Sequence, residues 1–207
     1  MRGALGVPDE SSLLLTVSRL SFWKRVDRSI RLVAALQAKG RDVHLAVVGS
    51  GHEEGRLRDL AAELGVSSRI HFVGGVARAD LPSYYASADM LLSLYDFSNL
   101  ANPVLEAMLL GCPVIAYDVG GTSDLVVDRI NGLLIRTPDD IEALTRTVSD
   151  LLDDDVRRGE LSGSAQTWAA EHLRSWAERM QLEIAELDAL IEAHSPGGAS
   201  ADGFAQT

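Results

Sequence analysis

The stretch that decides the fold is "MLLSLYDFSNLANPVLEAMLLGCPVIAYDV", residues 90–119. Two apolar runs of strand length stand at its ends, and a helical pattern lies between them. Asn102 can cap that helix, and Pro103 suits its first position because the first N–H groups of a helix have no partner within it. The stretch therefore predicts a strand, a helix and a second strand in succession.

The same alternation continues along the chain. The strands are almost continuously apolar, which is typical of strands covered on both faces. The predicted strands cover 13–19, 43–49, 69–75, 90–96, 113–119 and 131–136, and the predicted helices cover 26–38, 52–64, 79–88, 102–110 and 122–127. We therefore expect an α/β fold, a Rossmann-like doubly wound parallel sheet of about six strands, with ligands beyond the carboxyl ends of the strands.

The remainder is predicted to consist of carboxyl-terminal helices. Thr137 as cap and Pro138 at the first helical position give a start signal for a helix that runs to about residue 152. A long amphipathic stripe follows, made of Trp176, Met180, Ile184, Leu187 and Ile191. That stripe packs either on this domain or on a partner domain, and both alternatives stay open. We expect one folded domain over 1–194 and a disordered tail over 195–207.

Composition is that of an ordinary globular domain with a sizeable core: 207 residues, 46% hydrophobic and 24% charged. The longest uncharged run near the apolar centre, 107–117, is shorter than the roughly 18 apolar residues of a membrane-spanning helix. The first residues contain no signal-peptide apolar region. The single Cys112 excludes an internal disulfide, and we expect a cytoplasmic protein.

The net charge of −11 argues against nucleic acid as the main partner. Its distribution is uneven, because residues 1–75 hold 11 Lys and Arg against 8 Asp and Glu, whereas residues 76–207 hold 8 against 22. In the basic part, Arg28 and Arg31 are interpreted as a solvated helix face. His44 and His71 lie in predicted strands, where histidines usually belong to the core or the sheet edge, and we assign them no catalytic role.

Loops at the predicted carboxyl edge carry groups suited to a nucleotide. Arg19 ends the first strand and Lys24 follows five residues later, so a planar guanidinium and a mobile ammonium can straddle a diphosphate. The alternative is that both are surface side chains of a loop without a binding role. The helix beginning near Asn102 presents backbone N–H groups to an anion. Glu106, one turn further on, can accept hydrogen bonds from ribose hydroxyls, or else needs donors within the fold. In a third loop, the "GG" of residues 120–121 indicates either close approach to a ligand or a tight turn.

Five motifs occur together and in order: "TVSRLSFWK" (16–24), "AVVGSG" (46–51), "IHFVGGV" (70–76), "NPVLEAMLLGCPVIAYDVGGTSDLV" (102–126) and "NGLLI" (131–135). On these motifs the chain, over about residues 4–192, resembles the carboxyl-terminal, donor-binding domain of the family 4 retaining glycosyltransferases. Those enzymes have the GT-B fold, of which this chain would be one half.

The resemblance implies roles for individual residues. Arg19 and Lys24 would bind the diphosphate of a nucleotide sugar and act as the catalytic pair, and Glu106 would bind the ribose. The loop from Gly74 to Val76 would lie near the base. The backbone that would face the phosphates comprises Asn102, Pro103, Val104 and Leu105.

The sequence also departs from the family pattern. Ser98 stands where the family usually has a second Glu that contacts the transferred sugar, and Asp96 or Asn99 are the candidates to replace it. Ser98 and Asn99 are therefore included among the expected substrate-binding residues. Ser18 replaces a common Gly, and Ser123 replaces a frequent Pro.

The activity implied by the resemblance is transfer of a glycosyl group from a nucleotide-diphosphate sugar to an unknown acceptor, with retention of configuration and without a metal or other cofactor. The amino-terminal acceptor domain of GT-B enzymes is not part of the sequence, so we expect the fragment alone to be inactive. Expected partners are the donor, the acceptor and that domain, with no nucleic acid. Membrane association is expected only peripherally, through the missing domain.

Other classes of protein stay open. A non-catalytic module that binds a nucleotide or nucleotide sugar is the closest alternative, and a GT-B sugar epimerase fits the loop motifs less well. A dinucleotide oxidoreductase would need the G-x-G-x-x-G pattern after the first strand, and "SRLSFWK" lacks it.

Overall fold

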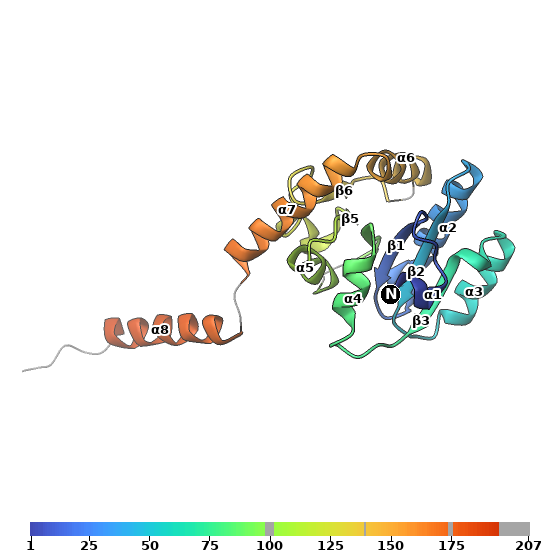
Figure 1. Cartoon of the computed structure of the whole chain (residues 1–207). Coiled ribbons are helices and arrows are strands. Elements are labelled where there is room, and N and C mark those ends of the chain that lie inside the picture. Colours follow the sequence, from blue (N-terminus) through green and yellow to red (C-terminus); the bar gives the residue numbers. More distant parts are fainter. Residues whose placement is uncertain (98–101, 139, 174–175, 195–207) are drawn as a thin grey trace, which may run out of the picture. The chain divides into compact units, whose positions relative to one another are not determined.

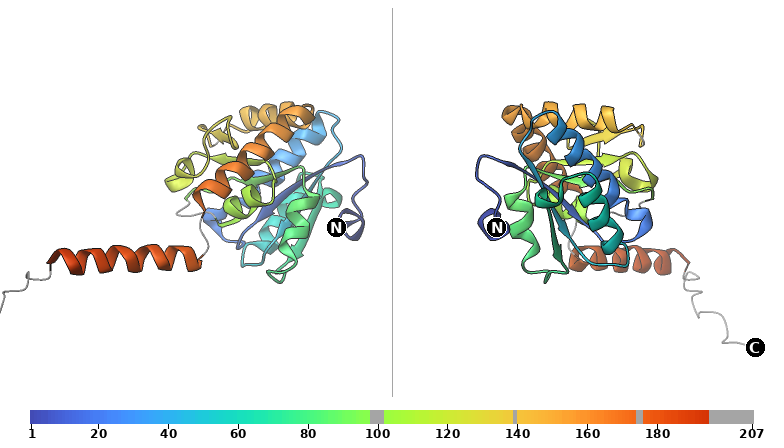
Figure 2. Two further views of the ribbon diagram at one scale, coloured as in Figure 1. Left: turned by 60° about the vertical axis from the view of Figure 1, so that its left-hand side comes forward. Right: turned by 90° about the vertical axis from the view of Figure 1, so that its right-hand side faces the viewer.

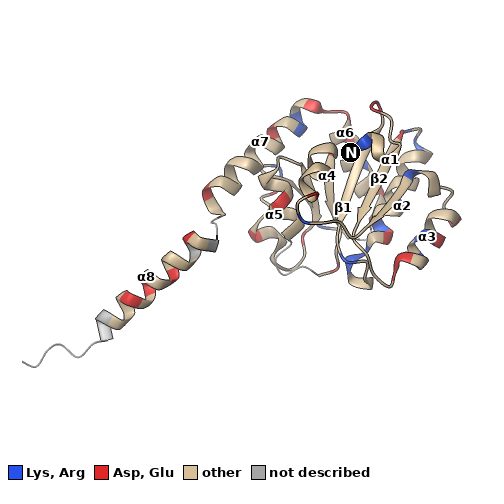
Figure 3. Ribbon diagram, turned by 60° about the horizontal axis from the view of Figure 1, so that its bottom comes forward, with Lys and Arg blue, Asp and Glu red and all other residues tan. Residues whose placement is uncertain are grey.

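The computed structural model describes residues 1–97, 102–138, 140–173 and 176–194. The chain divides into two compact units, Met1–Glu171 and His172–Thr207. The first unit contains the whole sheet (Figure 1). The second contains helix α8 (Trp176–His194), which carries acidic residues along its length (Figure 3).

The sheet has six parallel strands in the order β3-β2-β1-β4-β5-β6. The strands are β1 (Ser12–Val17), β2 (Val43–Val48), β3 (Ile70–Gly74), β4 (Met90–Ser93), β5 (Val114–Tyr117) and β6 (Leu133–Ile135). This order is that of a doubly wound sheet in which the direction of winding reverses between β1 and β4. The predicted fold class is confirmed. Each strand ends one to three residues earlier than predicted, because the last predicted residues belong to the loops of the carboxyl edge.

Helices cover both faces of the sheet (Figure 2). Right-handed crossovers place α2 and α3 on one face and α4 and α5 on the other, because the chain moves outward from β1 first in one direction and then in the opposite one. The helices of this unit are α1 (Arg2–Leu5), α2 (Val26–Ala38), α3 (Glu54–Glu63), α4 (Leu81–Ser87), α5 (Asn102–Leu109), α6 (Ile141–Leu152) and α7 (Asp155–His172), with 3-10 turns η1 (Phe22–Lys24), η2 (Ser67–Arg69) and η3 (Gly120–Asp124).

The central strands are buried because helices cover both faces of the sheet. Every residue of β2, β4 and β5 is buried, which agrees with the continuous apolarity of these segments. Helix α6 packs beside α2, and the Ser162 hydroxyl of α7 donates a hydrogen bond of 2.7 Å to the Gly111 carbonyl oxygen after α5. Helix α6 therefore covers the face that carries α2, and α7 lies beside the end of α5.

The start of α6 differs from the prediction. The cap is Asp140, whose carboxylate accepts a hydrogen bond of 2.8 Å from the Ala143 N–H. Thr137 instead contributes its carbonyl oxygen to a turn, accepting from the Asp140 N–H at 3.0 Å, so Pro138 precedes the helix. An aspartate caps at least as well as a threonine, and the helix begins at the later of the two residues. The segment predicted as a helix over 122–127 is the short turn η3.

His44 of β2 and His71 of β3 form a pair at one side of the sheet. The Nδ1 atom of His44 lies 2.8 Å from the Nε2 atom of His71, and the two rings are stacked with centroids 5.1 Å apart. The Arg69 guanidinium lies 2.7 Å from the other His44 nitrogen, and Asp42 lies 4.0 Å from it. Burial lowers the pKa of both histidines, and for His44 the nearby Arg69 lowers it further.

Stability is therefore expected to fall below about pH 6.5. Because the pKa of each histidine is lower in the folded chain, the unfolded chain takes up protons first as the pH falls, and the free energy of unfolding decreases. Urea unfolding at pH 7.5 and 5.5 measures this difference in wild type and in His71→Asn, which removes one of the two groups. The pH-dependent loss should shrink in His71→Asn and stay unchanged in His52→Asn, whose side chain is 70% exposed. Equal losses in all three proteins would contradict the assignment.

Candidate functional site

The loop that carries Arg19 is held by backbone hydrogen bonds on both sides of that residue. The Ser18 N–H donates to the Val48 carbonyl oxygen at 3.0 Å, and the Leu20 N–H donates to the Ser50 carbonyl oxygen at 2.9 Å. The first acceptor is the last residue of β2, and the second belongs to the turn that follows β2. The backbone of Arg19 is thereby fixed, while its side chain is exposed at the carboxyl edge of the sheet.

Two glycines of the "AVVGSG" motif make this contact possible. A Cβ atom on Gly49 would lie 1.9 Å from the Ser18 carbonyl oxygen, and one on Gly51 would lie 2.1 Å from the Leu20 carbonyl oxygen. Gly49 also has a φ of +129°, which other residues rarely adopt. The motif is therefore required for the close approach of the two turns, a role that the sequence did not reveal.

Lys24 lies at the end of η1 and is half-buried. Its Nζ atom stands 3.9 Å from the centre of the Tyr95 ring, a cation–π contact, and the Tyr95 hydroxyl donates to the Val17 carbonyl oxygen at 3.0 Å. Tyr95, from the loop after β4, thus places the ammonium against the end of β1.

Arg19 and Lys24 are close enough to repel each other. The pKa of Lys24 is lowered, first by burial and then by the charge of Arg19. Within the part of the chain that the structure describes, neither cation forms an ion pair with a carboxylate. An anion bound between them would relieve the repulsion and favour the charged form of Lys24.

The neighbouring arginines, in contrast, are paired with acids. Arg25 contacts Asp27 and Asp96, each at 3.1 Å, and Arg28 is buried with a guanidinium nitrogen 2.7 Å from Asp96. The prediction of a solvated helix face is therefore wrong for Arg28, since its guanidinium also donates to the Leu94 carbonyl oxygen at 3.0 Å. Two arginines already hold the Asp96 carboxylate, which argues against Asp96 as the replacement for the missing sugar-binding Glu.

The remaining candidates for that role, Ser98 and Asn99, lie outside the described residues. Helix α5 begins at Asn102 and contains Pro103 in its first turn, so its existence and start are as predicted. The residue before Asn102 also lies outside the described residues, and the capping role of Asn102 stays a prediction. The N–H groups of Val104 and Leu105 belong to the first turn, where backbone donors have no acceptor within the helix.

Glu106 has a donor within the fold. The hydroxyl of Tyr85, a residue of α4, donates a hydrogen bond of 2.8 Å to Oε2 of Glu106. Glu106 is half-buried, and no other hydrogen bond or ion pair of its carboxylate is found among the described residues. The sequence left open whether the Glu106 carboxylate is satisfied by a donor in the fold or by a ligand. The structure supplies a donor in the fold for one of its two oxygens, Oε2.

A hollow of about 320 Å³ opens at the carboxyl ends of β1, β2 and β3. It brings Arg19 together with Val76, from two of the predicted loops, while Gly74 is tied to the turn after β2 by a 2.8 Å hydrogen bond from the Gly49 N–H. Lys24 and Glu106 do not line it. Its lining consists of Val17, Ser18, Arg19, Val48, Gly49, Ser50, Gly75, Val76 and Leu81.

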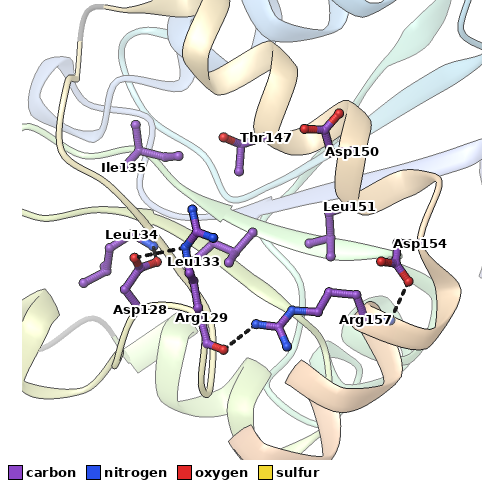
Figure 4. A pocket seen from close by; sticks show the side chains of 10 residues that line it. All are labelled: Asp128, Arg129, Leu133, Leu134, Ile135, Thr147, Asp150, Leu151, Asp154 and Arg157. Atoms are coloured by element: carbon purple, nitrogen blue, oxygen red, sulfur yellow. Dashed lines mark hydrogen bonds and ion pairs between the residues drawn. The ribbon is translucent and has the colours of Figure 1, made fainter.

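A second hollow, of about 260 Å³, lies between β6 and α6 and contains none of the predicted site residues (Figure 4). Two of its charged side chains are engaged within the fold. The Asp128 carboxylate accepts from the Leu134 N–H at 2.9 Å, and the Arg157 guanidinium donates to the Arg129 carbonyl oxygen and to Glu160. We therefore do not place the candidate site there.

Two features are absent from the residues that the structure describes. No group of three or more His, Cys, Asp and Glu side chains is arranged to hold a metal ion. None of the described helices combines the length and the apolar character needed to cross a membrane.

Comparison with known proteins identifies the family. The sequence profile "Glycosyl transferases group 1" matches residues 1–168, and the chain belongs to this family of glycosyltransferases. A 2-deoxystreptamine glucosyltransferase of Streptomyces kanamyceticus is 32% identical over 74% of this chain and 40% of its own length. A GDP-mannose-dependent phosphatidylinositol monomannoside mannosyltransferase of Mycolicibacterium smegmatis is 31% identical over 86% of this chain and 48% of its own length.

A solved structure gives the same result for the fold. Anabaena HepE in complex with UDP superposes with a TM-score of 0.80 at 27% identity, covering 91% of this chain and 51% of HepE. The chain thus has the architecture of one part of a GT-B enzyme, as predicted. It spans between 40% and 51% of the length of these three proteins.

The close approach of the two turns can be tested by adding one methyl group. Gly49→Ala should lower the free energy of unfolding by about 2 kcal/mol or more, because the new Cβ meets a backbone oxygen and φ is positive. Gly159→Ala is the matched control, since that glycine lies in helix α7 with open space around it. The control should be neutral or stabilised by about 0.5–1 kcal/mol. Urea unfolding measures both, and an unchanged stability of Gly49→Ala would contradict the described packing.

Proposed function

We propose that this chain binds the donor of a glycosyltransferase, a nucleotide-diphosphate sugar, with the diphosphate between Arg19 and Lys24. The observation that carries the proposal is the pair of mutually repelling cations at the carboxyl edge, neither of which contacts a carboxylate among the described residues. The neighbouring Arg25 is, in contrast, neutralised by two acids. A cationic pair of this kind suits a diphosphate.

The rest of the donor is assigned by position. The ribose hydroxyls are proposed to donate to Glu106, and the base to lie by the loop from Gly74 to Val76. The phosphates extend toward the first turn of α5, with Asn102, Pro103, Val104 and Leu105 facing them, and the transferred sugar lies toward Ser98 and Asn99. Two relatives support a nucleotide donor, since HepE has been crystallised with UDP and UDP-glucose and the mannosyltransferase is GDP-mannose-dependent.

The proposed reaction is transfer of the glycosyl group to an acceptor bound mainly by an amino-terminal domain, with retention of configuration. As the sugar departs, negative charge develops on the leaving diphosphate, and Arg19 and Lys24 stabilise it without a metal ion. Because the acceptor side lies on another domain, the chain by itself is proposed to bind donor without turnover. A non-catalytic binding module stays the alternative, and donor turnover after addition of an amino-terminal domain separates the two.

Calorimetric titration with UDP, GDP and ADP tests donor binding directly. Arg19→Ala and Lys24→Ala should each weaken nucleoside-diphosphate binding about ten-fold or more, because each removes a charge-assisted hydrogen bond worth about 1.5–3 kcal/mol. Arg58→Ala is a matched control, since it removes one positive charge from an exposed pair with Glu54 on α3. Equal affinities in all four proteins, or no binding to wild type, would overturn the proposal.

The pH dependence of binding should identify Lys24. Because its pKa is lowered by burial and by Arg19, Lys24 loses its proton at a lower pH than an ordinary lysine, and affinity for UDP should fall on the alkaline side. Lys24→Arg keeps the charge over the whole range, so its affinity should fall less between pH 7 and 10. Titrations at several pH values measure this, and parallel curves for the two proteins would contradict the role of Lys24.

A further inference from the structure

Helix α4 connects the two sides of the proposed donor site. Its first residue, Leu81, lines the hollow beside Val76, and Tyr85 donates to the Glu106 carboxylate from one turn further on. Residues four apart lie on the same face of a helix, so one face of α4 runs from the proposed base side to the proposed ribose side.

Tyr85 is suited to hold Glu106 in one orientation. The side chain is 1% exposed, and its pKa is raised, first by burial and then by the hydrogen bond to Glu106. The raised pKa keeps the hydroxyl protonated near neutral pH, so it remains a donor to Glu106 there. Its neighbour Tyr84 is also buried, at 8% exposure, and has no described side-chain hydrogen bond, so burial of a tyrosine in α4 does not by itself require this contact.

The hydrogen bond has a consequence for binding. A carboxylate oxygen that accepts from a fixed donor restricts the rotation of the glutamate side chain, and the other oxygen keeps its acceptor capacity. A ligand then loses less free energy to the ordering of the side chain when it binds. Phenylalanine at position 85 would keep the buried ring and remove only the donor.

We propose that Tyr85 is a positioning residue that orients Glu106 toward the ribose hydroxyls of the donor. This inference depends on the proposed function, because it needs Glu106 to contact the ribose. It concerns recognition of the ribose alone. Binding of the diphosphate by Arg19 and Lys24 should not depend on Tyr85.

Calorimetry with two ligands separates these effects. Tyr85→Phe should weaken UDP binding about five- to ten-fold and leave inorganic pyrophosphate binding unchanged, and Tyr84→Phe should change neither. Glu106→Gln should weaken UDP binding, and adding Tyr85→Phe to it should cost little more, because both substitutions remove one coupled interaction. In wild type, the Tyr85 hydroxyl proton should be visible by NMR as a slowly exchanging signal that shifts with UDP but not with pyrophosphate. If Tyr85→Phe does not fold, this wild-type signal serves as the test, and a signal that does not shift with UDP would overturn the positioning role.

The outcomes distinguish the two proposals. If wild type binds UDP and Glu106→Gln weakens it, but Tyr85→Phe binds UDP as wild type does, the positioning role is overturned and the proposed function stands. The same conclusion follows if Tyr85→Phe loses UDP and pyrophosphate equally. If wild type binds no nucleoside diphosphate, the proposed function itself fails.

Discussion

The arrangement of the carboxyl edge depends on one close approach, between the turn after β1 and the turn after β2. Hydrogen bonds from the N–H groups of Ser18 and Leu20 fix the backbone on both sides of Arg19. The approach requires Gly49 and Gly51, because a Cβ atom at either position would meet a carbonyl oxygen. An exposed cation is thereby carried on a rigid backbone. Rigid support of this kind lets a surface side chain serve as a binding group, since little order has to be imposed when the ligand arrives.

Two buried tyrosines extend the same principle to the other charged groups. Tyr95 presents its ring to the Lys24 ammonium and bonds to the end of β1, and Tyr85 presents its hydroxyl to Glu106. Tyr95 lies in the loop after β4, next to the point at which the sheet reverses its winding, and Tyr85 lies in α4, the helix before β4, which contacts β1. In doubly wound folds ligands bind at that reversal, because loops from neighbouring strands diverge there and leave a crevice. The order of the strands therefore explains why Lys24 and Glu106 are expected near a ligand.

Sequence patterns predicted most of the fold, whereas several contacts around the candidate site have no signal in the sequence. The apolar runs and the helix after Asn102 have local causes, so six strands and the principal helices could be located. The Asp140 cap was missed because two capping residues compete within four positions. Contacts between distant residues, such as Arg28 with Asp96 or Tyr85 with Glu106, depend on tertiary packing and leave no periodic signal. The short spacing between Arg19 and Lys24 is enough to predict that the two cations lie close together. The packing role of Gly49 and Gly51 has no signal in the sequence, because it depends on carbonyl oxygens of another turn.

We propose that two cations without carboxylate partners among the described residues, Arg19 and Lys24, form the diphosphate site of a glycosyltransferase donor domain. The most direct measurement is a crystal structure of the chain with UDP. The diphosphate oxygens should lie within hydrogen-bonding distance of the Arg19 guanidinium and the Lys24 ammonium. A nucleotide bound elsewhere, for example in the hollow between β6 and α6, with both cations still in solvent, would contradict it.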